Sequence, residues 1–255
     1  MKSVRKQHID SGQRFEACDR FVIRLSFSSS TMTNMTALKN FDVKVRAQQM
    51  GLFETPVVYS ELSGAEELME QLESAIRLQL KNTSGVSRSN IGSWHSDTDM
   101  LDWGGPAAQQ LADTAVSVAK RMSHFIGGSA DDLDWSVRMW ANVTPKGGLN
   151  HIHVHPGNLW AAVLYLDMGD TANGESVGGN FYLEDPRFPM CTMRENALRM
   201  MGIDGKPQQI EVDFKLARGN LIVFPAWLRH GVRQYNGPNE RISIAMNIDA
   251  SRRQD

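Results

Sequence analysis

The sequence predicts a mainly β fold with flanking helices, in which the second half forms a β sandwich or barrel. From Asp134 onward, short apolar stretches such as WSVRMWANV and RISIAMNID are separated by turn residues, which is typical of successive strands. Two stretches upstream carry apolar residues at helical spacing instead. Two helices followed by a run of strands favour this architecture over alternating βαβ units. Nucleotide-binding folds are disfavoured, because neither G-x-G-x-x-G nor a Walker A loop occurs.

The elements are expected in a definite order. A short strand is predicted over residues 52–59, interrupted at Pro56, and an amphipathic helix over 61–80. Pro106 opens a second helix, which Gly127 and Gly128 end. Strands then follow over residues 135–143, 151–155, 159–168, 179–185, 209–216, 220–227 and 241–249.

The composition is that of an ordinary globular protein. The 255 residues are 41% apolar and 22% charged, with a formal net charge of -2, which indicates neither a nucleic-acid nor a membrane partner. The longest apolar run, LWAAVLYL, is too short to span a bilayer. Only two cysteines occur, without a C-x-x-C pair, so we expect a reducing compartment, the cytoplasm.

The first 45 residues differ from the rest because they mix charges with the polar run SFSSSTMTNMT and show no sustained period. We expect residues 1–45 to be a poorly ordered extension, with Met32 and Met35 as alternative start sites. Residues 46–255 are then expected to form a single domain, with helical support over 60–128 and a β core over 134–250.

The stretch NHIHVHPGN places three of the seven histidines at every second position. In an extended chain His151, His153 and His155 share one face, and imidazole is the commonest protein ligand for transition metals. The alternative is a solvent-facing row of histidines on an edge strand. Downstream, His230 follows an apolar strand that Pro225 breaks, and it would supply a further ligand.

The strand RISIAMN places Arg241 and Ser243 on one face and Ile242 and Ile244 on the other. A guanidinium fork beside a hydroxyl suits a carboxylate, which it binds through two parallel hydrogen bonds. Taken alone, Arg241 is better explained as an ordinary surface arginine at a strand start.

H-x-H, a distal histidine and R-x-S together resemble the iron- and 2-oxoglutarate-dependent oxygenases. Four blocks in the same order, NHIHVHPGNLWAAVLYL, GGNFYLEDPR, GNLIVFPAWLRH and RISIAMN, are similar to the 2-oxoglutarate–Fe(II) oxygenase group of the prolyl-hydroxylase-like branch. The resemblance covers about residues 135–249. It implies a double-stranded β-helix, which is a jelly-roll core, with Fe(II), 2-oxoglutarate and O2 as cofactor and cosubstrates.

The resemblance also implies roles for single residues. The metal ligands would be His153, His155 and His230, with His151 as an alternative, although such enzymes usually have a carboxylate where this chain has His155. Arg241 and Ser243 would hold the distal carboxylate of 2-oxoglutarate, and this cosubstrate site would also include Tyr165 and Asn142. The substrate pocket would include Asn150, Trp160, Arg187 and Trp227. Tyr165 and the tryptophans could instead be core residues, and Arg187 could pair with Asp185 in a structural turn.

These inferences predict a dioxygenase that hydroxylates an unidentified small molecule or peptide and releases succinate and CO2. Two rivals remain open. One is a cupin that binds a metal but not 2-oxoglutarate, and the other is a non-enzymatic β-sandwich binding module. No nucleic-acid or membrane partner is expected, and pairing of exposed strand edges would give a homodimer.

Overall fold

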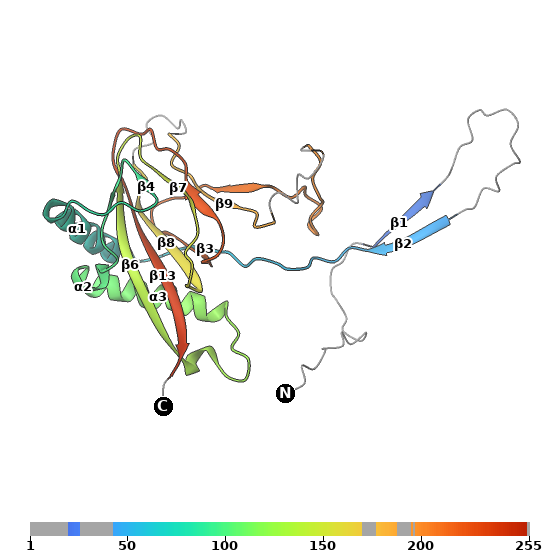
Figure 1. Ribbon diagram of the computed structural model, residues 1–255, viewed down its shortest axis with the longest axis horizontal. Helices are drawn as coiled ribbons and strands as arrows, with labels where there is room; N and C mark the ends of the chain where they lie inside the picture. Colours follow the sequence, from blue (N-terminus) through green and yellow to red (C-terminus); the bar gives the residue numbers. More distant parts are fainter. Residues whose placement is uncertain (1–19, 26–42, 170–176, 188–194, 196, 254–255) are drawn as a thin grey trace, which may run out of the picture. The chain divides into compact units, whose positions relative to one another are not determined.

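The computed structural model describes residues 20–25, 43–169, 177–187, 195 and 197–253 (Figure 1). The chain divides into two compact units. One contains the described residues up to Glu54 together with residues 199–208, and the other contains the described residues from Thr55 onward, apart from 199–208.

The smaller unit contains β1 (Arg20–Leu25) and β2 (Val43–Gln48), which pair antiparallel with Arg20 opposite Gln48. Beyond β2, the Gln49 side-chain amide donates a hydrogen bond to the Met201 carbonyl at 2.9 Å. The extension predicted over residues 1–45 lies mostly outside the described residues, so its order and the boundary after residue 45 stay predictions.

The larger unit is built on two antiparallel sheets. Among its described residues, one sheet has six strands in the order β3-β11-β8-β13-β6-β5, and the other has five in the order β10-β9-β12-β7-β4. The predicted mainly β fold with a double-stranded β-helix core is therefore confirmed. The strands are β3 (Val58–Glu61), β4 (Asn90–Ile91), β5 (Trp94–His95), β6 (Leu133–Thr144), β7 (Leu149–His153), β8 (Trp160–Asp167), β9 (Phe181–Glu184), β10 (Glu211–Phe214), β11 (Asn220–Pro225), β12 (His230–Val232) and β13 (Arg241–Arg252).

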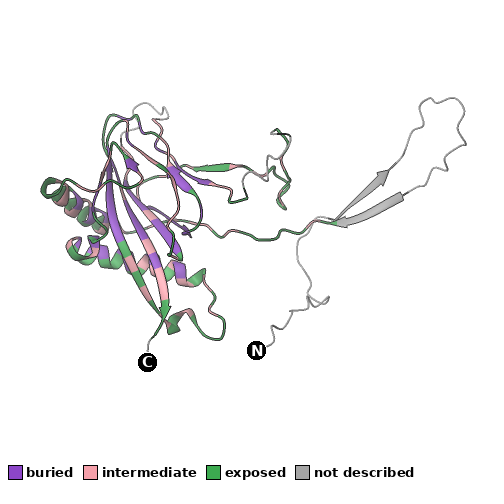
Figure 2. Cartoon of the chain, in the orientation of Figure 1, coloured by how far each residue is buried: buried purple, intermediate pink, exposed green. Residues whose placement is uncertain are grey.

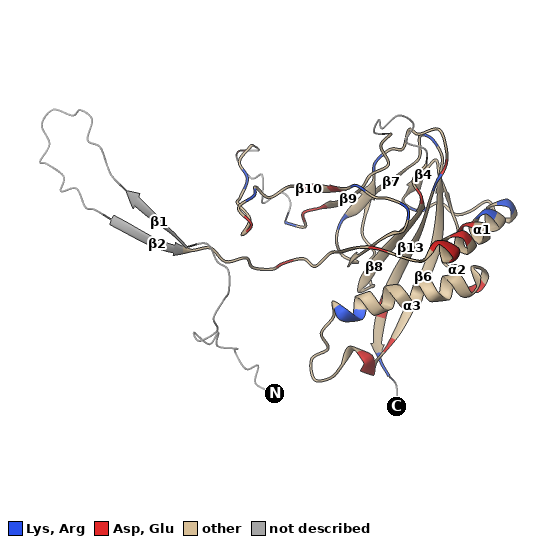
Figure 3. Cartoon of the chain, turned by 180° about the vertical axis from the view of Figure 1, so that it is seen from behind, with Lys and Arg blue, Asp and Glu red and all other residues tan. Residues whose placement is uncertain are grey.

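Three helices cover one face of the six-stranded sheet: α1 (Glu66–Asn82), α2 (Met100–Trp103) and α3 (Gly105–Arg121) (Figure 1). A short 3-10 turn, Ala130–Asp132, leads into β6. Helix α1 begins five residues later than predicted, because Gly64 with φ +67 is not helical. Figure 3 shows the acidic start and basic end of α1, which complement the helix dipole. Among the described residues, no helix is long and apolar enough to cross a membrane.

Two apolar clusters hold these layers together, and the sheet between them is the most deeply buried part of the chain (Figure 2). Leu72 and Leu111 from the helices pack against Ile244 of β13 on the outer face. On the inner face, Phe224 of β11 packs with Phe181 of β9, their ring centroids 5.3 Å apart. Burial of these side chains, worth about 1.5–3 kcal/mol each, holds the helices against the outer face and the second sheet against the inner face.

The alternation predicted for β13 is confirmed. Ile242, Ile244 and Met246 pack in the outer cluster, whereas Ser243 and Ala245 line a cavity between the sheets, which Met246 also borders. The outer apolar face therefore anchors β13, and the inner face presents its polar side chains to that cavity.

Candidate active site

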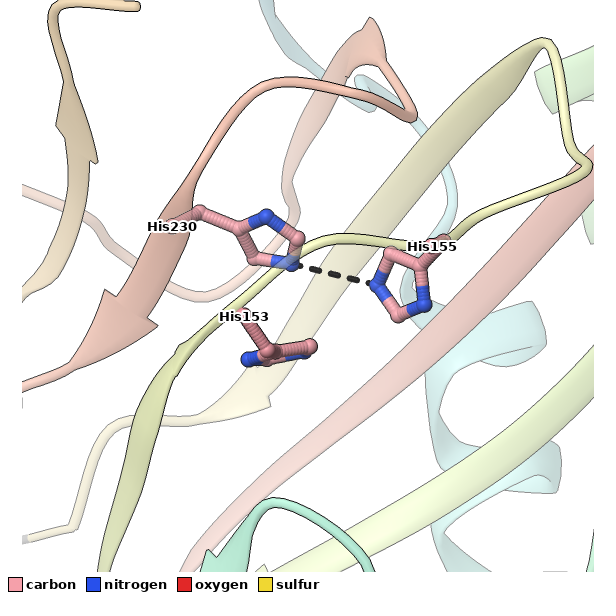
Figure 4. Close-up of side chains that lie close together, drawn as sticks. All are labelled: His153, His155 and His230. Atoms are coloured by element: carbon pink, nitrogen blue, oxygen red, sulfur yellow. Dashed lines mark hydrogen bonds between the residues drawn. The ribbon is translucent and has the colours of Figure 1, made fainter.

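Three histidines converge at one end of the space between the sheets (Figure 4). One nitrogen of each of His153, His155 and His230 lies within 4.8 Å of the others, and Nε2 of His155 is 3.1 Å from Nε2 of His230. His153 ends β7 directly opposite His230, which begins β12. His155 follows the strand, and its backbone N–H donates to the Ala226 carbonyl at 2.9 Å. Strand pairing and this one backbone bond thus bring together side chains that are far apart in sequence.

Two of the rings are oriented by backbone carbonyls. Nδ1 of His153 lies 2.7 Å from the His151 carbonyl, and Nδ1 of His230 lies 2.8 Å from the Leu228 carbonyl. Since a carbonyl only accepts hydrogen bonds, the proton sits on Nδ1 in both rings. Nε2 therefore keeps its lone pair and can bind a metal, with the outer carbonyl fixing the tautomer as in known metal sites.

Burial keeps the three imidazoles in the neutral form that a metal requires. Burial, and next the neighbouring His153, lower the pKa of His230 to about 3. Burial, and next His153, likewise lower the pKa of His155 to about 4, and the pKa of His153 is also lowered by burial. At neutral pH the cluster thus offers three uncharged nitrogen ligands, a donor set that suits Fe(II) and other first-row metals.

His151 stands apart from this cluster because its side chain is exposed. The register between β7 and β12 shifts between the pairs His230–His153 and Val232–Asn150, which marks a β-bulge. A bulge breaks the two-residue alternation, so the three histidines do not all share one face as the spacing predicted. The structure brings His153 and His155 together with His230, the preferred set of the resemblance.

A cavity of about 410 Å³ adjoins the three histidines between the two sheets. Of the residues expected around the cosubstrate, Asn142, Tyr165 and Ser243 line this cavity. Asn150, expected in the substrate pocket, also lines it, and its side-chain amide lies 3.4 Å from the Ser89 hydroxyl.

Arg241 is only 5% exposed, beside the ring of Tyr165, which lines the cavity. Its guanidinium carbon lies 5.7 Å from the Tyr165 ring centroid and 5.6 Å from that of Tyr235. Among the described residues it forms no ion pair, and its Nε and Nη2 have no hydrogen-bond partner. Burial lowers the pKa of Arg241. A buried guanidinium without an ion pair is costly, and an anion bound beside it would offset that cost.

Gly179 allows the backbone to approach this guanidinium closely. Its φ is +73, and a Cβ added there would lie 2.8 Å from Nη1 of Arg241. The second glycine of the GGNFYLED block is therefore required both by its conformation and by its contact with Arg241.

Three residues expected in the substrate pocket do not line the cavity. Trp160 packs in the outer cluster, where its indole N–H donates to the Ser123 hydroxyl at 2.9 Å, because Ala161 and Tyr165 occupy the inner face of β8. Trp227 is 54% exposed in the turn before His230. Arg187 forms a paired contact with Asp185, Nε to Oδ1 at 3.0 Å and Nη2 to Oδ2 at 2.7 Å, which is the structural turn considered as its alternative.

The structure adds residues that the sequence did not single out. His95 of β5 is buried, lines the cavity and stacks on Trp140 of β6 with a centroid distance of 5.5 Å. The Trp140 ring in turn lies 5.7 Å from that of His155. His95 lies in a turn-rich stretch without periodicity, so only the pairing of β5 with β6 reveals its position.

Residues 138–247 match the model of the family described as "Putative 2OG-Fe(II) oxygenase". Among curated proteins, none matches this chain. The chain is similar to a solved prolyl-4-hydroxylase of Pseudomonas putida, with 17% identity and a TM-score of 0.50 over 78% of this chain and 94% of that chain. It is also similar to a prolyl hydroxylase of Trichoplax adhaerens solved with a hypoxia inducible factor peptide, with 12% identity and a TM-score of 0.52 over 76% of this chain and 83% of that chain. At these identities the structural likeness shows the fold.

Proposed function

Because residues 138–247 match the model of the 2OG-Fe(II) oxygenase family, we propose that this chain hydroxylates a C–H bond of a small molecule or peptide and releases succinate and CO2. The observation that carries the proposal is the buried, unneutralised guanidinium of Arg241 beside the cavity that holds three neutral imidazoles. A metal site alone would not need such a group, whereas a site for a metal and a dicarboxylate would.

His153, His155 and His230 would hold the iron through Nε2. When bound, the iron with 2-oxoglutarate and O2 supplies the oxidising chemistry, and the protein supplies position and surroundings. His155 occupies the position where a carboxylate is usual in such enzymes, so the protein contributes three neutral ligands. The metal then keeps its full positive charge, which favours an anionic cosubstrate over a neutral one.

Arg241 would bind the distal carboxylate of 2-oxoglutarate. Its planar fork suits two parallel hydrogen bonds to a carboxylate. The Tyr165 hydroxyl, which is buried without a hydrogen-bond partner among the described residues, and the Ser243 hydroxyl are further donors on the same wall. Burial raises the pKa of Tyr165, so its hydroxyl keeps the proton that it would donate.

The inner apolar cluster would keep bulk water away from the reacting atoms. Phe181 and Phe224 pack directly against His230, with ring centroids 5.8 Å and 4.7 Å from its imidazole. A low-dielectric wall strengthens the attraction between the metal, Arg241 and a dicarboxylate. The cupin and binding-module alternatives leave Arg241 without a task.

Calorimetric titration of 2-oxoglutarate tests the proposal, with metal-free and Ni(II)-loaded protein compared. We expect 2-oxoglutarate to bind the loaded protein at least about 100-fold more tightly, because chelation adds to the contact with Arg241. The His230→Ala variant should lose this difference, and His151→Ala should keep it. Equal binding with and without metal would overturn the proposal and favour the cupin alternative.

Partner and compartment are further parts of the proposal. The low cysteine count supports a cytoplasmic location, and the net charge of -2 argues against a nucleic-acid substrate. A homodimer formed through sheet edges would appear as twice the chain mass in light scattering.

A further inference from the structure

One side of the cavity is formed by residues 83–98, here called the upstream loop. It contributes Arg88, Ser89, His95 and Thr98 to the cavity wall. None of these residues has a role in the proposed binding of iron or 2-oxoglutarate. They are therefore available to contact the primary substrate, and the following inference rests on the proposed function.

Hydrogen bonds to both sheets hold the upstream loop in place. Its β4 pairs with β7 of one sheet, and its β5 pairs with β6 of the other. The Ser96 N–H donates to the Ala141 carbonyl and the Ala141 N–H donates to the Ser96 hydroxyl, both at 3.0 Å. The Asn90 side chain accepts from the Arg88 N–H and donates to the Ser93 carbonyl, both at 2.7 Å. The backbone of this loop is therefore held in place before any ligand binds.

Arg88 is an exposed cation on this loop at the edge of the cavity. Its side chain forms no ion pair or hydrogen bond with the described residues. Asp97, the acidic residue of the same loop, accepts the Thr98 N–H at 2.8 Å and does not line the cavity. The cavity wall beside Arg88 offers it no carboxylate among the described residues.

The residues that line the cavity leave an excess of positive charge beside a bound metal. The described cavity wall contains Arg88 and neither Asp nor Glu. Arg241 lies beside the cavity, where the charge of Asp167 acts on it from outside the wall. A divalent metal and Arg88 carry three positive charges, and 2-oxoglutarate would supply two negative ones. A substrate with an anionic group would offset the remaining excess at Arg88.

His95 presents a complementary polar atom on the same cavity wall as Arg88. Its Nδ1 lies 2.5 Å from the Ser96 carbonyl, so Nδ1 carries the proton and Nε2 is an acceptor. Burial lowers the pKa of His95, and the charge of Arg88 lowers it further, although Ser96 and Asp97 act the other way. The neutral ring therefore favours an N–H or O–H donor close to the anionic group.

We propose that the primary substrate is an anionic small molecule whose carboxylate or phosphate binds Arg88, with an adjacent N–H or O–H group at His95. Arg88 is thus a specificity-determining residue of the oxygenase. Free acids should bind, and their uncharged amides should not.

Arginine side-chain NMR tests this proposal on the full chain loaded with diamagnetic Zn(II) and 2-oxoglutarate. Benzoate, inorganic phosphate and benzamide serve as probes, and the Nε–Hε signals of three arginines are followed. We expect the Arg241 signal to shift when 2-oxoglutarate is added. Benzoate or phosphate should then shift the Arg88 signal in a saturable way, and benzamide should not. Arg121 is a matched reference, since it is also exposed and forms no ion pair with the described residues.

Variants add a second readout, the backbone signal of Thr98. In Arg88→Gln, half-saturation by benzoate should need at least about fivefold more ligand, as expected for an exposed charge pair. Arg121→Gln removes the same charge elsewhere and should change nothing. If the Arg88 signal moves no more than that of Arg121, the anionic-substrate inference is wrong, even if Arg241 responds to 2-oxoglutarate. If Arg241 does not respond, the proposed function fails, and the response of Arg88 then decides separately whether an anion site exists.

Discussion

Nε2 of His155 lies 3.1 Å from Nε2 of His230, although 75 positions separate the two residues in the sequence. Nε2 of His230 carries no proton, because its Nδ1 proton is directed at the Leu228 carbonyl. A proton on His155 can bridge the pair in the metal-free protein, and a metal can replace that proton. The separation is therefore that expected of two ligands of one ion.

Replacement of His155 tests whether it is the third ligand. We expect His155→Ala to weaken binding of Co(II) at least about 100-fold, since one of three ligands is lost. His155→Asp should stay within about tenfold of the wild type, because it restores the usual two-histidine, one-carboxylate set. His151→Ala is the matched control and should bind Co(II) normally. Calorimetry measures all three, and a loss in His151→Ala equal to that in His155→Ala would show that the ligand set is different.

Arg241 should lower the free energy of unfolding of the protein until an anion binds beside it. The Arg241→Leu variant should raise the free energy of unfolding of the metal-free protein by about 1–3 kcal/mol, because it removes an unpaired buried charge. The same variant should lose the gain in Tm that 2-oxoglutarate gives the Ni(II)-loaded wild type. A variant that is less stable and still gains Tm from 2-oxoglutarate would refute this role.

Trp140 positions His155 through ring contact. Unlike His153 and His230, His155 has no hydrogen bond from Nδ1 to any described residue, and its ring lies against Trp140 at 5.7 Å. Trp140→Ala should therefore weaken Co(II) binding by about tenfold, and Trp140→Phe should restore most of it. The visible spectrum of the bound Co(II) reports the ligand geometry directly. An unchanged Co(II) affinity and spectrum in Trp140→Ala would show that the ring has no such role.

The histidine cluster should make stability depend on pH between about 6.5 and 5. The folded-state pKa of His230 is about 3 and that of His155 about 4, both below the ordinary value of 6.5. The free energy of unfolding therefore has its full value above pH 6.5. It falls as the pH decreases toward the folded-state pKa values of these two residues. At pH 5 the loss is about 2 kcal/mol for each residue. Urea unfolding of the metal-free protein should show this loss, and His230→Gln should show a shallower one. A flat profile in the wild type would mean that the rings are not desolvated.

Trp160 gives a test of the outer packing. Trp160→Phe removes the hydrogen bond to Ser123 and should lower the free energy of unfolding by about 1–2 kcal/mol. Binding of 2-oxoglutarate should not change, because this side chain points toward the helices. A large loss of 2-oxoglutarate affinity without a loss of stability would show that the Trp160 side chain contacts the cavity after all.

Local alternation explains which parts were predictable from sequence. In RISIAMN, polar and apolar residues alternate, so the outward face of Ile242 and Ile244 could be read directly. In LWAAVLYL every residue is apolar, so nothing in the sequence distinguishes the face of Trp160 from that of Tyr165. The inward and outward faces were predicted correctly in RISIAMN, where polar and apolar residues alternate. They were predicted wrongly for Trp160 in LWAAVLYL, where they do not.

The remaining features depend on contacts between distant segments. The β-bulge that separates His151 from His153 arises from the pairing of β7 with β12, which no local pattern encodes. His95 reaches the cavity only because β5 adds to the edge of β6. The absence of a carboxylate near Arg88 can likewise be recognised only from the residues that line the described cavity wall.

An anaerobic titration of the metal-free protein with Fe(II) and then 2-oxoglutarate, followed by visible absorption, tests the central claim most directly. We predict a weak charge-transfer band that appears only when both are present and is absent in His230→Ala. Arg241→Ala should need much more 2-oxoglutarate to reach the same band. If Fe(II) binds and 2-oxoglutarate leaves the spectrum unchanged, the three histidines hold a metal for another purpose, and the oxygenase account is contradicted.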